Sequence, residues 1–316
     1  MATIANFGLD VGIYGPLATP ANVLGLARHA EDTGFESIWL ADHVAFPAKF
    51  KSEYPYSAKG DFPTKLDEPL LEPIATMGVL VGATKRVRIG TAVLVMPHRN
   101  PLLTARMLVT LDQFSGGRIE LGAGVGWLEE EFEALHTFDF KKRGKVTDEY
   151  LQIFKAIAAG GEVGFKGETY SFDPVISQPG SVQRPHPPVL VGGLADAALR
   201  RVARHANGWL AVTVTPEKMP ERLATLKRMT EEEGRKMSDL KLVYKMFVAI
   251  GTPKRSRFDA REPGTGTIDE ITQDLRGLFG LGFSRVIVRF RSAASADDLK
   301  RQVDRFVSEI VPKVAL

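Results

Sequence analysis

Residues 87–127, VRIGTAVLVMPHRNPLLTARMLVTLDQFSGGRIELGAGVGW, carry the clearest fold signal in this 316-residue chain. Residues 88–95 form a β-branched, apolar run of the length of a buried strand. Asn100 and Pro101 give a helix N-cap followed by proline at the first helical position, and Gly116-Gly117 can take the positive φ of a helix end. Residues 118–121 predict a second strand. This order of strand, helix and strand indicates a parallel α/β protein.

The same alternation of strand and helix continues along the whole chain. Eight segments have the composition of strands, and a helical pattern follows each one: residues 7–12, 37–40, 88–95, 118–121, 189–191, 208–211, 242–250 and 285–289. Eight such units predict a (β/α)8 TIM barrel of the α/β class. An open doubly wound sheet is the alternative, because alternation alone does not show closure. The residues that we expect to be buried on the barrel strands include Ile38, Ile89, Ile119, Leu190 and Val286.

We expect a single domain over residues 1–316, with insertions at about residues 42–66 and 160–188. The first insertion is rich in proline, tyrosine and phenylalanine, and loops of this length in a compact enzyme are usually functional. The second insertion begins with a pattern typical of a small hairpin, at residues 164–173, and continues into a proline-rich run. Substrate specificity is expected to reside in such variable segments.

The composition excludes several classes of protein. The chain has no cysteine, which rules out disulfides, thiolate metal sites, iron–sulfur clusters and a cysteine nucleophile. Its formal charge of +3 is not concentrated in a basic block, so we expect no nucleic-acid partner. No apolar run approaches the ~18 residues that span a bilayer. The N-terminal residues show no secretory pattern, and we expect a cytoplasmic enzyme that uses no metal.

In a TIM barrel the active site lies at the carboxyl ends of the strands. The expected strand ends carry these groups: Asp42-His43, His98, residues 122–127, Gly192-Gly193, Thr213 and Arg289. Glycines directly after a buried strand indicate that another backbone, or a flat ligand, approaches closely. Residues 122–127 are not a dinucleotide-binding fingerprint, because Trp127 occupies the position of the third glycine.

Three segments resemble the bacterial luciferase-like monooxygenase superfamily and, within it, the coenzyme F420-dependent oxidoreductases. They are ADHVAFP at 41–47, RIGTAVLVMPHRNPLLTARMLVTLDQFSGGRIELGAGVGWLEEEFEAL at 88–135, and PPVLVGGLADAALRRVARHANGW at 187–209. The resemblance covers nearly the whole chain, with the segments in the family's order. It implies a (β/α)8 barrel, a flavin or deazaflavin laid across the carboxyl ends of the strands, and a homodimer.

The resemblance implies a catalytic role for Asp42 and His43. They match the Asp-His pair of the F420-dependent members, in which the histidine lies close to the reacting ring and the substrate. An imidazole suits proton transfer near neutral pH. The other interpretation is that His43 bonds to Asp42 and only stabilises the loop. His98 stays open between a role in the site and a structural one.

The resemblance also implies a binding surface for the cofactor ring. Thr91, Ala92 and Val93 match the family strand that carries a non-prolyl cis peptide beneath the ring. Gly124 and Gly126 match backbone that approaches the cofactor closely, and Trp127 would form a wall of the pocket. Some F420-dependent enzymes place a carboxylate about where Trp127 stands, so we do not expect a catalytic acid at that position.

Gly192 and Gly193 match the loop that the family uses for the cofactor phosphate. Unpaired amides at the N-terminus of the helix that follows would form an anion site. The alternative is a plain turn between strand and helix. Leu194 and Ala195 follow the glycines here where the family often has Asn-Ser, so side chains would contribute less to phosphate binding. Arg289 could meet an anionic substrate or cofactor tail, or form an ion pair.

These observations predict an F420-dependent oxidoreductase that transfers a hydride between the deazaflavin and a small organic substrate. An FMN-dependent monooxygenase is the alternative, because reduced FMN can activate oxygen whereas a deazaflavin acts mainly as a hydride carrier. A barrel hydrolase or lyase is less favoured, since the chain lacks a GxSxG elbow, cysteine and an HExxH pair. A non-catalytic cofactor-binding protein is disfavoured by the presence of Asp42-His43.

Overall fold

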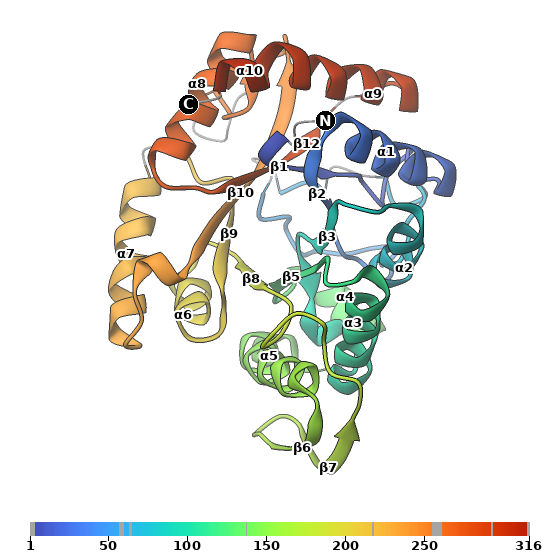
Figure 1. Ribbon diagram of the computed structural model, residues 1–316, viewed down its shortest axis with the longest axis vertical. Helices are drawn as coiled ribbons and strands as arrows, with labels where there is room; N and C mark the ends of the chain where they lie inside the picture. The colour runs from blue at the N-terminus through green and yellow to red at the C-terminus, as the bar shows by residue number, and fades with distance from the viewer. Residues whose placement is uncertain are drawn as a thin grey trace.

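The computed structural model describes residues 4–56, 60–62, 65–136, 138–216, 218–254, 261–291 and 293–314. Eight parallel strands form a closed barrel in the order β1-β2-β3-β5-β8-β9-β10-β12 (Figure 1). The barrel strands are β1 (Ile4–Asp10), β2 (Phe35–Leu40), β3 (Arg88–Thr91), β5 (Ile119–Gly124), β8 (Val189–Gly192), β9 (Gly208–Val212), β10 (Lys241–Ile250) and β12 (Arg285–Phe290). The ring closes because β1 pairs with both β2 and β12, and β10 pairs with both β9 and β12. The predicted TIM barrel is confirmed.

The helices form an outer layer around the barrel (Figure 1). They are α1 (Pro20–Thr33), α2 (Pro73–Ala83), α3 (Pro101–Ser115), α4 (Glu129–Ala134), α5 (Arg143–Ala159), α6 (Asp196–His205), α7 (Met219–Glu232), α8 (Ile268–Gly280), α9 (Ala296–Arg305) and α10 (Val311–Val314). The predicted caps form. Asn100 accepts a hydrogen bond from the Leu103 backbone amide at 3.1 Å, and Gly116 ends α3 in the left-handed conformation at φ 66°. The spacing of Thr267 and Glu270 in the sequence also predicts a capping box, and the two residues form it at the start of α8. None of the described helices has the length and apolar character needed to cross a membrane.

Three regions of the chain are divided into shorter elements. Residues 88–95 do not form one strand: β3 ends at Thr91, and β4 (Leu94–Val95) follows after a cis peptide between Ala92 and Val93. The helical region from 129 to 159 is divided between α4, a short 3-10 turn (Phe140–Lys142) and α5. The last helix changes to a π turn (Phe306–Ile310) between α9 and α10.

A large indole fills the inside of the barrel. Trp39 is fully buried and packs with apolar side chains from other strands: Ala92, Leu190, Leu210, Val243 and Ile287. Gly8 and Gly90 make room for it, because a Cβ at either residue would lie 2.5 Å from an atom of the indole. The five residues expected on the barrel strands are all buried, with Leu190 inside the barrel and the others packed between strands and helices.

The two insertions lie at different places in the fold. The second contains the antiparallel hairpin of β6 (Gly161–Lys166) and β7 (Ser171–Ser177), which projects beyond α5 (Figure 1). The first belongs to the connection between β2 and α2, at the carboxyl end of the barrel. Two shorter 3-10 turns (Met96–His98 and Met237–Asp239) and the short strand β11 (Thr265–Gly266), parallel to β10, complete the described elements.

Candidate active site

The site is built at the carboxyl ends of the strands, where the ends of β2, β4 and β5 meet the first turn of α4. His43, three residues past the end of β2, is 6% exposed. Its Nδ1 lies 2.7 Å from Oε2 of Glu131, a residue of α4 whose side chain is fully buried. The other carboxylate oxygen of Glu131 accepts hydrogen bonds from the backbone amides of Val44 at 2.7 Å and Ala45 at 3.2 Å. His43 and the start of the first insertion are therefore fixed to α4 by one carboxylate.

The structure does not join Asp42 to His43 as the sequence suggested. The Asp42 carboxylate makes a bidentate pair with Arg99, at 2.7 and 2.8 Å, and accepts from the Val95 backbone amide at 2.8 Å. Arg99 also bonds to Glu72 at the start of α2. Asp42 therefore secures the end of β4, while Glu131 is the carboxylate that contacts the histidine.

Aromatic rings surround the imidazole of His43. Phe46 lies 4.6 Å from the imidazole, measured between ring centroids, and Phe62 and Trp127 lie at 5.3 and 5.9 Å. Phe62 stacks on Trp127, and Tyr54 packs against both. Trp127 thus forms a wall beside His43, with its partners supplied by the first insertion.

The expected cis peptide is present between Ala92 and Val93. The glycines at the neighbouring strand ends accommodate this segment of backbone. A Cβ on Gly124 would lie 2.3 Å from Val93, a Cβ on Gly192 would lie 2.8 Å from it, and a Cβ on Gly122 would lie 1.9 Å from the Thr91 carbonyl. Close approach of another backbone, one of the two reasons considered from the sequence, accounts for Gly122, whereas Gly124 and Gly192 leave room for the side chain of Val93.

Gly126 and Gly193 take positive φ, at 82° and 122°, and so favour glycine for conformational reasons. Gly193 precedes α6, and its carbonyl accepts from the Trp209 indole at 2.8 Å. The first residue of α6 is Asp196, which pairs with Arg222 at 2.7 Å. A carboxylate in this first turn reduces the attraction of the helix N-terminus for an anion. The positive charge near this turn comes from the side chain of Arg222, which is paired with Asp196.

Three largely buried charged side chains form ion pairs that connect three strands at the carboxyl end of the barrel. Asp10, at the end of β1, is 2.7 Å from both Lys245 Nζ on β10 and Arg289 Nη1 on β12. Lys245 also donates to the carbonyl of Ala92, the residue before the cis peptide bond, at 3.0 Å. Burial alone would raise the pKa of Asp10, but the two cations hold it below its ordinary value. Burial would lower the pKa of Arg289, yet the Asp10 carboxylate raises it.

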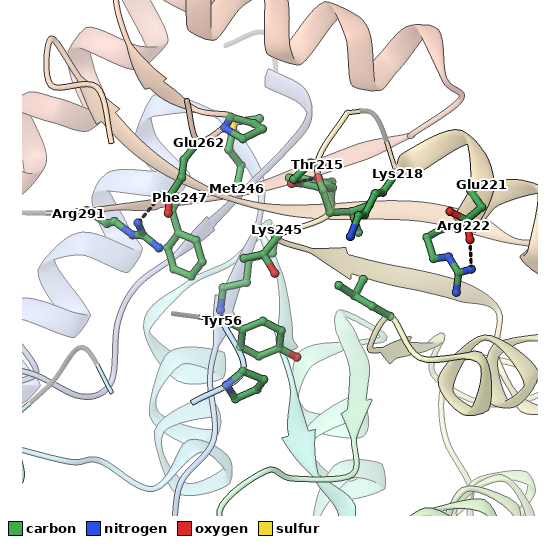
Figure 2. Close-up of a pocket in the computed structure, with 16 residues that line it drawn as sticks. Tyr56, Thr215, Lys218, Glu221, Arg222, Lys245, Met246, Phe247, Glu262 and Arg291 are labelled. Carbon is green, nitrogen blue, oxygen red and sulfur yellow. Dashed lines mark hydrogen bonds and ion pairs between the residues drawn. The ribbon is translucent and has the colours of Figure 1, made fainter. Parts of the chain in front are cut away.

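A cavity of about 390 Å³ opens beside Lys245, over the ends of β9 and β10. In Figure 2, Tyr56 from the first insertion lies across the cavity from the side chains of β10. Its lining combines apolar groups, such as Met246 and Phe247, with hydroxyl groups and cations. The polar lining residues include Thr213, Thr215, Lys218, Arg222 and Arg291. Arg291 is bonded to Glu262 at 2.7 Å.

His98, which the sequence left open, is buried near the carboxylate of Glu131 but does not reach it. Its Nδ1 is 3.9 Å from Glu131 Oε1, and neither ring nitrogen has a hydrogen-bond partner among the described residues. Burial lowers the pKa of His98 against the opposing influence of Glu131 and Asp42. The residue is therefore a neutral neighbour of the site, packed edge-on against Phe132 at 4.8 Å.

The sequence analysis missed Glu131, Lys245 and Asp10. Lys245 and Asp10 could have been found from the sequence, because each is a charged residue within an apolar strand. Such residues are usually buried with a partner or belong to a functional site. Glu131 was harder to find, since residues 129–131 are three consecutive glutamates and only the orientation of α4 selects the one that faces His43. Its neighbour Glu130 instead accepts from the Lys51 backbone amide and the Ser52 hydroxyl, at 2.6 and 2.7 Å.

The protein is a closed (β/α)8 TIM barrel. Its carboxyl end carries a cavity and a histidine bonded to a carboxylate, which are features of an enzyme site. The model of the luciferase-like monooxygenase family matches residues 1–275, and the chain belongs to this family. It is therefore a flavin- or deazaflavin-dependent oxidoreductase of the luciferase-like type.

The similar proteins include one FMNH2-dependent and one F420-dependent enzyme. The chain is 35% identical over 210 residues to an uncharacterized protein of Mycobacterium tuberculosis, covering 66% of this chain and 72% of the relative. It is 29% identical over 186 residues to the FMNH2-dependent dimethylsulfone monooxygenase of Pseudomonas putida, covering 58% of this chain and 46% of that enzyme. An F420-dependent secondary alcohol dehydrogenase, solved with an F420-acetone adduct, has a similar structure (TM-score 0.79, 17% identity, all of both chains covered). At that identity the likeness shows the fold alone.

The cavity has a lining suited to a flat, anionic cofactor of the type that the family uses. The lining does not include the residues that the sequence assigned to cofactor binding, which are Thr91, Ala92, Val93, Gly124, Gly126, Trp127, Gly192 and Gly193. Lys245 connects the two regions, because it lines the cavity and donates to the Ala92 carbonyl. The volume of the cavity lies in the range of about 300–1,000 Å³ that is usual for cofactor sites. Phe247 and Tyr56 supply flat apolar walls, while Thr213 and Thr215 supply hydroxyls and Arg222 a cation toward α6. Lys245, with its ammonium group between Asp10 and the Ala92 carbonyl, adds a positive charge at the base of the cavity.

Proposed function

We propose that the protein is an F420-dependent oxidoreductase that transfers a hydride between the deazaflavin and a small organic substrate. The bound deazaflavin supplies the hydride chemistry. His43 exchanges a proton with the substrate at Nε2, and Asp42 holds the end of β4 in place through Arg99. The aromatic walls around His43 exclude water from this proton transfer.

The observation that supports this proposal is the environment of His43. Its Nδ1 is bonded to a buried carboxylate, and no hydrogen bond to Nε2 is present among the described residues. An imidazole with one nitrogen anchored and the other open is suited to general acid–base catalysis. Transfer of a hydride to or from a carbon bearing oxygen needs such a partner for the accompanying proton.

We propose that the cofactor lies across the ends of β3, β5, β8 and β9. Its ring would rest on Thr91, Ala92 and Val93, with Trp127 as a wall. The backbone at Gly124 and Gly126 borders this surface, and the loop at Gly192 and Gly193 lies toward the phosphate. Arg222, paired with Asp196, would meet an anionic tail.

An FMN-dependent monooxygenase is the second candidate, favoured by the similarity to the dimethylsulfone monooxygenase. Equilibrium titration of the purified protein with F420 and with FMN, followed by fluorescence, tests the choice. We expect tight binding of F420 and weak binding of FMN. Tight FMN binding with oxygen consumption supported by a flavin reductase, and no F420 binding, would reject the F420 proposal.

We also propose that the protein forms a homodimer, as the family resemblance implies. Large apolar side chains are exposed on α2 and α3, at Val79, Leu103 and Phe114, the last being 80% exposed. Light scattering after size-exclusion chromatography measures the mass directly. A mass near 34.6 kDa at micromolar concentration would show a monomer and reject this proposal.

A further inference from the structure

We propose that Glu131 is the positioning residue of the site: it fixes the tautomer of His43, so that the imidazole presents an unprotonated Nε2 to the substrate. This inference rests on the proposed function for its catalytic consequence. The tautomer itself is a property of the protein without cofactor or substrate. It can therefore be tested even if the proposed reaction is wrong.

The contacts of Glu131 restrict which atoms of the Glu131–His43 pair can carry a hydrogen. Its Oε1 accepts from two backbone amides, of Val44 at 2.7 Å and Ala45 at 3.2 Å. Backbone N–H groups can only donate, so Oε1 can only accept. The remaining oxygen, Oε2, lies 2.7 Å from His43 Nδ1. Two backbone donors and one ring nitrogen thus converge on one carboxylate whose side chain is fully buried.

Glu131 is held as a carboxylate by this arrangement. Burial alone would raise its pKa, but the hydrogen bonds with His43 and with the amide of Val44 hold the pKa below its ordinary value. An ionised carboxylate has no proton to donate, so the hydrogen on the Glu131–His43 bond belongs to Nδ1. A neutral imidazole has one N–H, and Nε2 is then left with its lone pair.

The groups that face His43 from other elements leave Glu131 as its charged partner. Tyr14 follows β1, Phe46 and Phe62 belong to the first insertion, and Trp127 follows β5; all four face the imidazole with aromatic rings. The nearby charges are already paired, because Asp42 is bonded to Arg99. His98 is buried as a neutral ring.

This geometry defines the proton step. When the substrate is oxidised, its O–H bond breaks and the proton forms a bond to His43 Nε2. A bound deazaflavin would accept the hydride from the adjacent C–H bond as the carbon–oxygen double bond forms. His43 becomes an imidazolium, whose charge Glu131 compensates at Nδ1. Reduction of the substrate runs through the same steps in reverse.

The variant Glu131→Gln tests this mechanism because it changes one oxygen to an NH2 group. The Val44 and Ala45 amides require an acceptor, so the glutamine oxygen should take the place of Oε1. The NH2 group then faces Nδ1, which must accept, and the ring must carry its proton on Nε2. The substitution keeps the shape of the side chain but should invert the tautomer of His43.

Two neighbouring glutamates on α4 provide matched controls. Glu133→Gln makes the same change of charge at an exposed position of the same helix. Glu130→Gln weakens the other attachment of the first insertion, at Lys51 and Ser52, without touching His43. Both variants should keep the wild-type tautomer.

Nitrogen NMR of ¹⁵N-histidine-labelled protein, without cofactor, reads the tautomer directly. The chain has six histidines, and His43→Gln identifies the signals of interest. We expect Nδ1–H in the wild type and in both control variants, and Nε2–H in Glu131→Gln. Nε2–H in the wild type, or an unchanged tautomer in Glu131→Gln, would overturn the proposal. The wild-type spectrum decides the matter even if the variant fails to fold.

Kinetics then test the catalytic consequence. We expect Glu131→Gln to lower kcat by about 10²–10⁴-fold, the usual range for loss of general acid–base catalysis. The Kd for the cofactor should change less than about threefold, because Glu131 acts through His43. A change in kcat of less than about tenfold, in a variant whose tautomer has inverted, would reject the role of Glu131 in catalysis. Failure of every form to bind F420 or FMN would instead reject the proposed function and leave the tautomer result standing.

Discussion

Both ends of the barrel contain buried ion pairs, but the amino-end cluster around Arg285 is balanced in charge, whereas the carboxyl-end cluster around Asp10 has more cations than carboxylates. At the amino end of the strands, Arg285 bonds to Glu120 at 2.7 Å and to Glu36 at 2.5 Å, and Arg88 contacts Glu120 as well. Two cations thus meet two carboxylates. At the carboxyl end, one carboxylate, Asp10, lies between two cations, Lys245 and Arg289.

The difference separates residues that support the barrel from residues that serve the site. A buried pair with all its charges matched is costly to break but offers nothing to a ligand. The Asp10 cluster has one positive charge in excess, while Arg99 at the same end lies between Asp42 and Glu72. In the proposed function, this local excess and Nε2 of His43 would meet the anionic cofactor and the substrate. This division agrees with the placement of active sites at the carboxyl ends of TIM-barrel strands.

The largest expected effect is on catalysis at the carboxyl end. His43→Ala should lower turnover by about 10²–10⁴-fold, because a proton-transfer partner acts in the transition state. The Kd for the cofactor should change less than about threefold. Steady-state kinetics and equilibrium titration on the same preparation give both numbers. Unchanged turnover would return His43 to a structural role.

A comparable change at the amino end should affect stability and not chemistry. Glu120→Ala leaves Arg285 and Arg88 short of a partner and should lower the free energy of unfolding by about 3–5 kcal/mol. Urea denaturation measures this loss. Glu36→Ala is the control, because Glu36 is about one-third exposed and Arg285 keeps Glu120; it should cost less than about 1 kcal/mol. Equal losses in the two variants, or a large fall in kcat of folded Glu120→Ala, would break the distinction between the two ends.

Lys245→Met should convert the carboxyl end into a balanced pair of Asp10 and Arg289. The Ala92 carbonyl loses its donor, so we expect a loss of stability of about 1–3 kcal/mol. Removal of the excess charge should weaken binding of the anionic cofactor about tenfold, which corresponds to ~1.4 kcal/mol. Titration and urea denaturation separate the two effects. Full cofactor affinity in this variant would show that the excess charge does not serve the ligand.

The smallest effect concerns pH. His98 has a folded pKa below its ordinary value of 6.5, so as pH falls below 6.5 the unfolded chain binds a proton before the folded protein does. Stability is therefore lost from pH 6.5 downward until the folded pKa is reached. His98→Phe removes this loss, and we expect the stability difference between variant and wild type to grow by less than about 1 kcal/mol from pH 7 to pH 6. A difference that stays constant with pH would show that His98 is not buried as a neutral ring.

The fold could be predicted because its signals are local. Asn100 with Pro101, Gly116, and the pair of Thr267 with Glu270 mark helix ends within a few residues, and each forms the expected cap. The interruption between Thr91 and Leu94 has no local signal, since the whole run is apolar and β-branched. It followed from the family resemblance and not from the residues themselves.

The candidate site could be predicted in part. Strand ends drew attention to His43, which the structure buries against a carboxylate. The identity of that carboxylate was out of reach, because Glu131 is 88 positions away in the sequence and differs from Glu129 and Glu130 only in the direction that it faces. From the sequence, the adjacent Asp42 was the carboxylate considered as the partner of His43, but its carboxylate is paired with Arg99.

The hydrogen bonds from Val44 and Ala45 to Glu131 have a consequence for the evolution of this enzyme. They fix the root of the first insertion, next to His43, and Glu130 holds a second point at Lys51 and Ser52. Substitutions or length changes after Ser52 would reshape the substrate wall while both anchors stay intact. The scaffold could therefore acquire new substrates without a change in the residues proposed to transfer the proton, and libraries for altered specificity should begin beyond that second anchor.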